Sequence, residues 1–90
     1  MPTLKVPTPL RSYTDGQAEV PVQGATIAEA MNSLLEQHPA LRPHLYNNAG
    51  QLRPFVNLFV GENNIKDLQG LDTQLKADDR VMLIPSIAGG

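Results

Sequence analysis

The chain has 90 residues, of which 41% are hydrophobic and 18% are charged, so its composition indicates one globular domain, 1–90, with a modest core, and excludes a disordered chain. The formal net charge of -2 argues against a nucleic-acid-binding protein, which would need a clustered basic face. The absence of cysteine excludes disulfides, thiolate nucleophiles and zinc–thiolate sites.

Residues 3–22 have the pattern of a β-hairpin. Thr3-Leu4-Lys5-Val6 alternates polar and apolar side chains, as a half-buried strand does. Asp15-Gly16 readily adopts the positive φ of a tight turn, and Glu19-Val20-Pro21-Val22 can return as the second strand.

A helix is predicted from Thr26 onward. Thr26 and Glu29 form a capping box, in which a hydroxyl and a carboxylate satisfy the free amides at the start of a helix. Apolar residues then recur at helical spacing, and Pro39 ends the helix after His38. This apolar stripe should pack on a sheet, and it consists of Ile27, Ala30, Met31, Leu34 and Leu35.

Residues 39–54 combine prolines and a glycine with polar residues, which indicates a long loop with one helical turn near 41–45. The clearest strand follows at 55–60. Its first face is aliphatic and suits the core, whereas its second face is mixed and could contact solvent or a partner. Val56, Leu58 and Val60 form the first face, and Phe55, Asn57 and Phe59 form the second.

The last third of the sequence contains a second apolar strand. Residues 61–64 should form a turn and 71–75 a single helical turn, before the strand Val81-Met82-Leu83-Ile84. This strand has no polar alternation. Such a run usually lies in the centre of a sheet, often beside a parallel neighbour, or has one face covered by another protein.

The order strand, strand, helix, strand, short element, strand predicts an α+β protein with a β-grasp (ubiquitin-like) fold, in which one main helix crosses a mixed sheet. A ferredoxin-like arrangement would need a second substantial helix, for which residues 66–76 are too short. No apolar run is long enough to cross a bilayer, so we expect a cytoplasmic protein.

No motif for catalysis or metal binding stands out in the sequence. His38 and His44 flank two prolines without a cysteine or paired acid nearby, so we expect ordinary surface histidines. Asp78 and Asp79 are better explained as turn residues than as catalytic acids. We therefore expect no catalytic residue, no bound cofactor and no metal in this chain.

Two glycines, Gly89 and Gly90, come last, after the apolar strand and a short spacer. Because they have no side chains, they would allow a carboxylate to be threaded through a channel too narrow for other residues. Residues 86–90 are predicted to form a flexible tail, which reaches at most about 17 Å when extended and could enter a neighbouring active site.

Residues 79–90 resemble the C-terminal signature of the ubiquitin-like sulfur carriers, the ThiS/MoaD family, in which an acidic turn, an aliphatic strand and a short tail end in a free Gly-Gly. Residues 55–61 and 26–35 are similar to the middle strand and the helix of that family. The resemblance therefore spans nearly the whole chain.

Three branches of this family serve the synthesis of molybdopterin, of the thiamine thiazole and of cysteine. The chain looks most like the carrier of the cysteine synthase pathway, through its length, residues 7–11, residues 53–57 and the ending Ala88-Gly89-Gly90.

The resemblance implies that an ATP-dependent activating enzyme converts the Gly90 carboxylate into an acyl-adenylate, from which sulfur displaces AMP to leave a thiocarboxylate. ATP would then be used by that partner, and this chain would be a substrate and not an enzyme. A sulfur-accepting enzyme, namely cysteine synthase, the molybdopterin synthase large subunit or thiazole synthase, would be the second partner. Gly89 and Ala88 would give the tail access to these enzymes.

Two other functions compete with the sulfur carrier. A ubiquitin-like modifier would use the same adenylate but join Gly90 to lysines through isopeptide bonds. A non-covalent subunit would only present its sheet, without chemistry at Gly90.

The body of the protein must also contact these partners. Phe59, Met82 and Ile84 are the candidate partner-binding residues, because exposed apolar groups on a sheet often mark an interface. The alternative is that the loop at 39–54 covers them.

Overall fold

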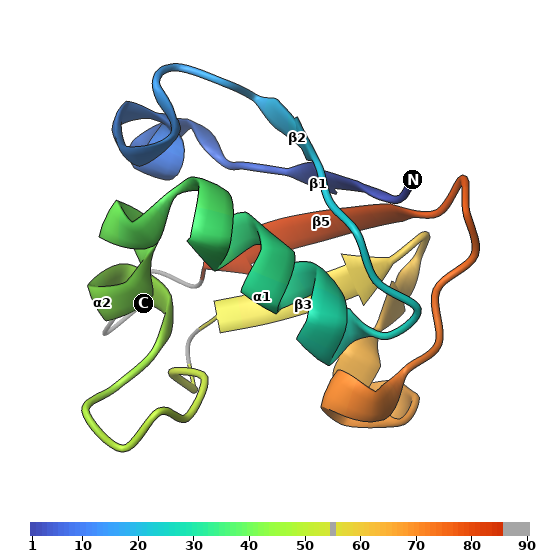
Figure 1. Ribbon diagram of the computed structural model, residues 1–90. Helices are drawn as coiled ribbons and strands as arrows, with labels where there is room; N and C mark the ends of the chain where they lie inside the picture. The colour runs from blue at the N-terminus through green and yellow to red at the C-terminus, as the bar shows by residue number, and fades with distance from the viewer. Residues whose placement is uncertain (55, 86–90) are drawn as a thin grey trace.

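The apolar strand near the end of the sequence lies at the centre of the sheet, as predicted. The computed structural model describes residues 1–54 and 56–85, and its five strands follow the order β2-β1-β5-β3-β4 (Figure 1). β5 (Arg80–Pro85) pairs in parallel with β1 (Thr3–Lys5) and antiparallel with β3 (Val56–Val60). Val81 and Leu83 on one face of this strand are buried in the core, whereas Met82 and Ile84 on its other face are exposed.

The first two strands form the predicted hairpin, but their connection is more structured than a tight turn. β1 pairs antiparallel with β2 (Glu19–Pro21), and the predicted positive φ occurs at Asp15 (56°) and Gly16 (82°). The preceding residues form a 3-10 helix, η1 (Thr8–Thr14), which the sequence pattern does not predict. The buried Thr14 hydroxyl holds this helix in place, since it lies 3.1 and 2.9 Å from two backbone carbonyl oxygens.

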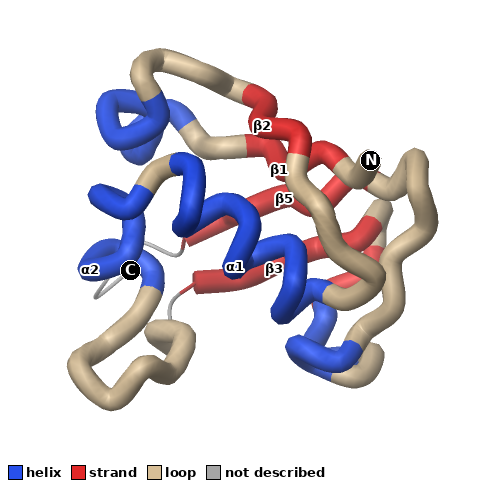
Figure 2. Tube along the Cα trace, in the orientation of Figure 1, coloured by secondary structure: helices blue, strands red, loops and turns tan. Residues whose placement is uncertain are grey.

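The main helix, α1 (Ile27–Gln37), begins at the predicted cap. The Thr26 hydroxyl accepts a hydrogen bond from the Glu29 amide at 3.3 Å, and the Glu29 carboxylate accepts one from the Ala25 amide at 2.8 Å. The carboxylate thus reaches the residue before the cap instead of the cap itself. All five residues of the predicted apolar stripe are buried, and α1 crosses one face of the sheet (Figure 2).

Residues 39–54 contain the predicted helical turn. A short 3-10 helix, η2 (Pro39–Leu41), leads directly into α2 (Arg42–Leu45), and both end on a completely buried leucine. Arg53 then ties the rest of the segment back to α2, because its Nε atom and its backbone amide donate to carbonyl oxygens of α2 at 3.0 and 2.8 Å. Residues 39–54 therefore form an ordered segment, held together by these hydrogen bonds, and not an open loop.

The turn after β3 is shorter than the sequence predicts. Asn63–Asn64 form a strand, β4, that pairs antiparallel with the last two residues of β3. The turn itself is limited to Gly61-Glu62, where Gly61 has a φ of 61°. Asparagine has a low β propensity, so this strand exists because the edge of β3 is available beside it.

The predicted helical turn at 71–75 is a 3-10 turn, η4 (Gly70–Asp72), and a second one, η3 (Ile65–Asp67), precedes it. η4 ends early because of Thr73. Its buried hydroxyl donates to the Gly70 carbonyl at 2.7 Å and accepts from the Gln69 amide at 3.2 Å.

The hydrophobic core lies between α1 and the inner face of the sheet. Leu4, Val81 and Leu58, from three adjacent strands, are among its fully buried residues. Within residues 1–54 and 56–85, no helix is long and apolar enough to span a membrane. Phe55 and the predicted tail, 86–90, lie outside the described residues.

Gly24 connects β2 to α1 at a point where the backbone leaves no room for a side chain. Its φ is 149°, and a Cβ atom here would lie 2.6 Å from the Glu29 Cβ and 2.8 Å from the Ala30 nitrogen. Gly16 also has a positive φ, but a Cβ there would meet nothing within 4 Å. The two glycines therefore separate the effect of backbone conformation from that of close packing.

We predict that Gly24→Ala lowers the free energy of unfolding by about 1–3 kcal/mol more than Gly16→Ala does, since both variants strain the backbone and only the first adds a steric contact. Urea unfolding of the two variants measures the difference. Equal losses would show that the close approach to α1 contributes nothing.

Candidate functional site

The three residues predicted to bind partners lie together on the outer face of the sheet, opposite α1. β3 and β5 pair so that Phe59 is directly opposite Met82, and Asn57 is directly opposite Ile84. Side chains of directly opposed residues lie on the same face of a sheet. Phe59, Met82 and Ile84 therefore form one surface, which we call the outer patch.

The outer patch is open to solvent. Met82 is 37% exposed and Ile84 is 41% exposed, whereas Phe59 is half-buried. Segment 39–54 therefore does not cover the two residues of β5, contrary to the alternative considered from the sequence. Exposed apolar side chains grouped on a sheet favour contact with another protein, because that contact removes them from water.

Charged side chains border the outer patch. Lys5 on β1 is the register neighbour of Met82, and Arg80 on β5 forms an ion pair with Glu19 on β2, with 3.6 Å between Nη1 and Oε1. Both members of the pair are largely exposed, so the pair adds little stability. Charges at the rim of an interface act mainly on the rate and orientation of encounter.

The outer patch comes directly before the segment that contains the predicted reactive group. Ile84 is the second-last residue of β5, a strand held between two neighbours. Ala88, Gly89 and Gly90, predicted to provide access and to react, lie outside the described residues. A partner that holds the patch would therefore hold the strand from which these residues continue.

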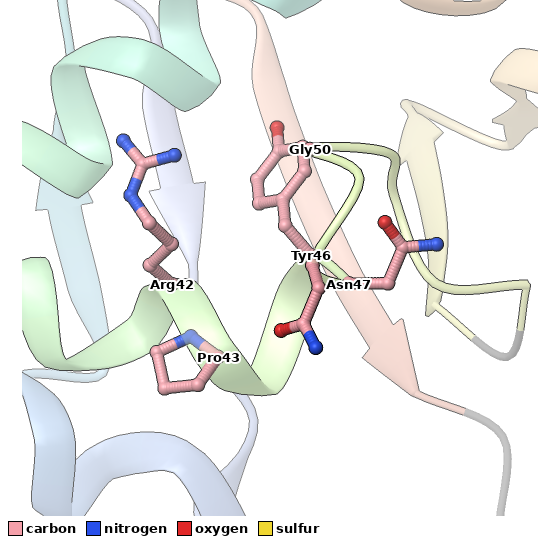
Figure 3. A pocket seen from close by; sticks show the side chains of 6 residues that line it. Arg42, Pro43, Tyr46, Asn47 and Gly50 are labelled. Atoms are coloured by element: carbon pink, nitrogen blue, oxygen red, sulfur yellow. The ribbon is translucent and has the colours of Figure 1, made fainter.

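A concave site, the α2 pocket, lies beside α2 and the loop that follows it. Its volume is about 320 Å³, and the residues that line it are Arg42, Pro43, Tyr46, Asn47, Asn48 and Gly50 (Figure 3). Arg42 begins α2 and Tyr46 follows its last residue, a spacing that places both side chains on one side of the helix. Figure 3 shows the two side chains extending in the same direction.

Sequence reasoning missed the α2 pocket, because residues 39–54 have the composition of an irregular loop. The signal that could have indicated it is the four-residue spacing between Arg42, inside the helical turn predicted at 41–45, and Tyr46, one residue beyond that turn.

The two histidines have different surroundings. His44 stacks on Tyr13, with 4.2 Å between ring centroids and 29° between ring planes, so it joins η1 to α2 and is half-buried. His38 caps the end of α1 through its backbone amide. Groups of acidic, histidine or cysteine side chains suited to a metal ion do not occur among the described residues. Asp79 is a turn residue as expected, since its carboxylate accepts from the Lys76 amide at 2.8 Å.

Nearly the whole chain matches a known family, because the profile of the ThiS family covers residues 4–90. The chain belongs to the ThiS family. The sulfur carrier protein CysO of Mycobacterium tuberculosis (strain ATCC 25618 / H37Rv) is 31% identical to it over 90 residues, which cover 98% of this chain and 97% of that relative. This ThiS-family protein is thus related to a sulfur carrier along nearly its whole sequence.

Two solved structures have the same architecture. The Amycolatopsis orientalis BexX/CysO complex contains a chain with a TM-score of 0.89 and 29% identity, and the match covers 100% of both chains. Small archaeal modifier protein 1 (SAMP1) from Methanosarcina acetivorans has a TM-score of 0.87 at 28% identity, over 99% of this chain and 95% of that one. The ubiquitin-like β-grasp fold predicted for this ThiS-family protein is therefore confirmed.

Tyr46 is the polar aromatic group of the α2 pocket. Burial raises the pKa of the Tyr46 phenol above its ordinary value, and the Arg42 guanidinium lowers that pKa by a smaller amount. The phenol is therefore uncharged at neutral pH and can donate a hydrogen bond. Because the pKa is higher in the folded state, its contribution to stability is complete below the unfolded pKa of about 10 and is lost as the pH rises through the folded value.

We predict that Tyr46 titrates above pH about 10 in the Tyr13→Phe variant, where it is the one remaining tyrosine. Arg42→Gln in the same background should raise the pKa of Tyr46 further, because a nearby cation no longer favours the phenolate. Phenolate absorbance against pH measures both effects. Lys66→Gln is the control, since this exposed lysine does not line the pocket, and an equal rise in both variants would contradict a local role for Arg42.

Proposed function

We propose that this ThiS-family protein is a sulfur carrier that delivers sulfur as a thiocarboxylate on Gly90. The observation that supports this proposal most is the likeness to the sulfur carrier CysO over 98% of this chain and 97% of the relative. The family match also extends to Gly90, the residue whose carboxylate would react. The match therefore includes both the folded body of the protein and Gly90, the residue proposed to react.

The chemistry follows from the weakness of a carboxylate as an electrophile. A Gly90 carboxylate oxygen attacks the α-phosphate of ATP on the activating enzyme, and pyrophosphate leaves. A sulfur nucleophile at the sulfide oxidation level then forms a C–S bond at the acyl carbon, and AMP departs with the electrons of the broken C–O bond. The chain has no cysteine, so no thiol of its own competes for the activated acyl group.

The catalytic groups for both steps belong to the partner enzymes in this proposal. The CysO of Amycolatopsis orientalis was crystallised in a complex with BexX, which supports a mode of action through protein partners. The outer patch is the surface that we assign to docking, because it is apolar, exposed and continuous with β5. A partner docked on the outer patch would receive the tail from the fixed end of β5, Pro85.

Cysteine synthesis is the destination that we favour for the sulfur, because a relative similar over nearly the full length is a CysO protein. The molybdopterin synthase large subunit and thiazole synthase are the alternative acceptors. Each acceptor would take sulfur from the same thiocarboxylate, so the choice lies in the docking surface of the acceptor and not in the chemistry of Gly90.

A protein modifier is the second candidate function, supported by the likeness to SAMP1 of Methanosarcina acetivorans at a TM-score of 0.87. A modifier would use the same acyl-adenylate. The difference lies in the next nucleophile, which is a lysine amine of another protein instead of sulfur.

Intact-mass measurement separates these functions. We predict that the chain, incubated with its activating enzyme, ATP and a sulfur source, exchanges one oxygen atom for one sulfur atom, and that deletion of Gly90 abolishes the exchange. Conjugates linked to lysines in cells, without that exchange, would favour the modifier. If neither product forms and deletion of Gly90 leaves function intact, the protein acts as a non-covalent subunit and the proposal is wrong.

A second prediction concerns the outer patch. Ile84→Asp should slow thiocarboxylate formation at least about tenfold at a fixed enzyme concentration, because a carboxylate at the centre of an apolar contact would lose its water. Leu71→Asp is the matched control, since Leu71 is 38% exposed, close to the 41% of Ile84, but lies in η4. Equal rates for the two variants would exclude the outer patch as the docking surface for that enzyme.

A further inference from the structure

The α2 pocket belongs to a segment with an uneven charge. Residues 37–61 contain two arginines and two histidines and no acidic residue, whereas residues 62–79 hold five acids. Arg42 lines the pocket itself, and the Arg53 guanidinium donates to the carbonyl of Pro43, another residue that lines it. The pocket thus suits an anion, in a protein whose formal net charge is -2.

The polar groups that face this pocket still have bonding capacity. Within residues 1–54 and 56–85, the Arg42 guanidinium takes part in no ion pair or side-chain hydrogen bond, and Arg42 is exposed. The Tyr46 side chain, whose phenol is uncharged at neutral pH, extends in the same direction as that of Arg42 (Figure 3). A guanidinium and a phenol together can donate several hydrogen bonds to the two oxygens of a carboxylate.

The pocket also lies near the end of β5. Pro85, the last residue of β5, is paired with Val56, whose amide donates to the Arg53 carbonyl at 3.0 Å. Arg53 in turn is bonded to α2 through two hydrogen bonds. The end of β5 is therefore connected to α2 through one strand pairing and the hydrogen bonds of Arg53. Figure 1 shows the end of β5 and α2 on the same side of the molecule.

We infer that the α2 pocket binds the protein's own C-terminal carboxylate, or the thiocarboxylate formed from it, through Arg42 and Tyr46. This inference rests on the proposed function, because that function requires a free carboxylate on Gly90. Five residues follow Pro85 in the sequence, and they reach at most about 17 Å, in a body whose extents are 24 to 30 Å. The reach, the position of the pocket and the opposite charges all favour this occupant.

The contact gives the carrier a resting state. An ion pair on an exposed arginine is weak and sensitive to salt, so a partner that binds the outer patch can take the tail from the pocket without a large cost. Until then the pocket holds the reactive group against the body of the protein. The outer patch and the α2 pocket thus have separate roles, the first in docking and the second in storage.

The test is an NMR comparison of the isotope-labelled full chain with three variants. We expect Arg42→Gln to move the Gly89 and Gly90 amide resonances toward those of the isolated peptide Ser-Ile-Ala-Gly-Gly, and Arg42→Lys to move them only part of the way. Lys66→Gln, which removes an exposed cation outside the pocket, should leave them unchanged. Unchanged core resonances would show that each variant is folded.

A chain with a C-terminal amide in place of the carboxylate makes the test sharper. Its Arg42 side-chain resonance should match that of an amidated chain lacking Gly89 and Gly90, and Arg42→Gln should then cause no further shift in its tail. Tail resonances that are identical in the wild type and Arg42→Gln would overturn the inference. Binding of inorganic phosphate in the pocket without any response of the tail would overturn it as well.

The result of this NMR experiment is independent of the intact-mass experiment that tests the proposed function. Thiocarboxylate formation measured by intact mass on the same variants reports on the chemistry of Gly90, whether or not the tail rests in the pocket. A chain that forms the thiocarboxylate but shows no tail contact would retain the carrier function and lose only this inference.

Discussion

The structure depends on the insertion of β5 between β1 and β3. Leu4 faces Val81 across the parallel pair, and Leu58 faces Leu83 across the antiparallel pair, so one strand joins the two halves of the sheet. Without it, the hairpin β1–β2 and the ribbon β3–β4 would each be an isolated two-stranded unit, which is at best marginally stable in water. The apolar stripe of α1 would then have no continuous surface to cover.

The alternation of side chains along β5 gives the strand two roles. Val81 and Leu83 are buried in the core, while Met82 and Ile84 stay exposed on the outer patch. The same backbone hydrogen bonds that close the core therefore also hold the outer patch, the surface proposed for docking. Since the strand continues into the tail, recognition and delivery in the proposed function share one rigid starting point, and a partner needs no movement of the body to position the reactive end.

The parts of the fold that follow from local spacing could be predicted from the sequence. The capping pair Thr26 and Glu29, the apolar stripe of α1 and the central position of β5 are of this kind. η1, β4 and the α2 pocket were missed because they depend on contacts distant in sequence or on buried polar groups. Thr14 lies between two carbonyls, Asn63–Asn64 pair only because β3 is adjacent, and Arg53 folds the loop back onto α2. Of the site, the outer patch was predicted from apolar residues at alternate positions of β3 and β5, whereas the pocket had only the four-residue spacing of Arg42 and Tyr46 as a signal.

The pairing of β1 with β5 joins segments that lie almost the whole length of the sequence apart. During synthesis the sheet cannot close until β5 has left the ribosome, so β1 and β2 are made long before the strand that joins them to β3. A product that stops short of β5 would leave the core residues of β1 and β3 exposed to water and to proteases. In the proposed function, only a folded chain that contains β5 would therefore present Gly90, the residue proposed to react, to a partner enzyme.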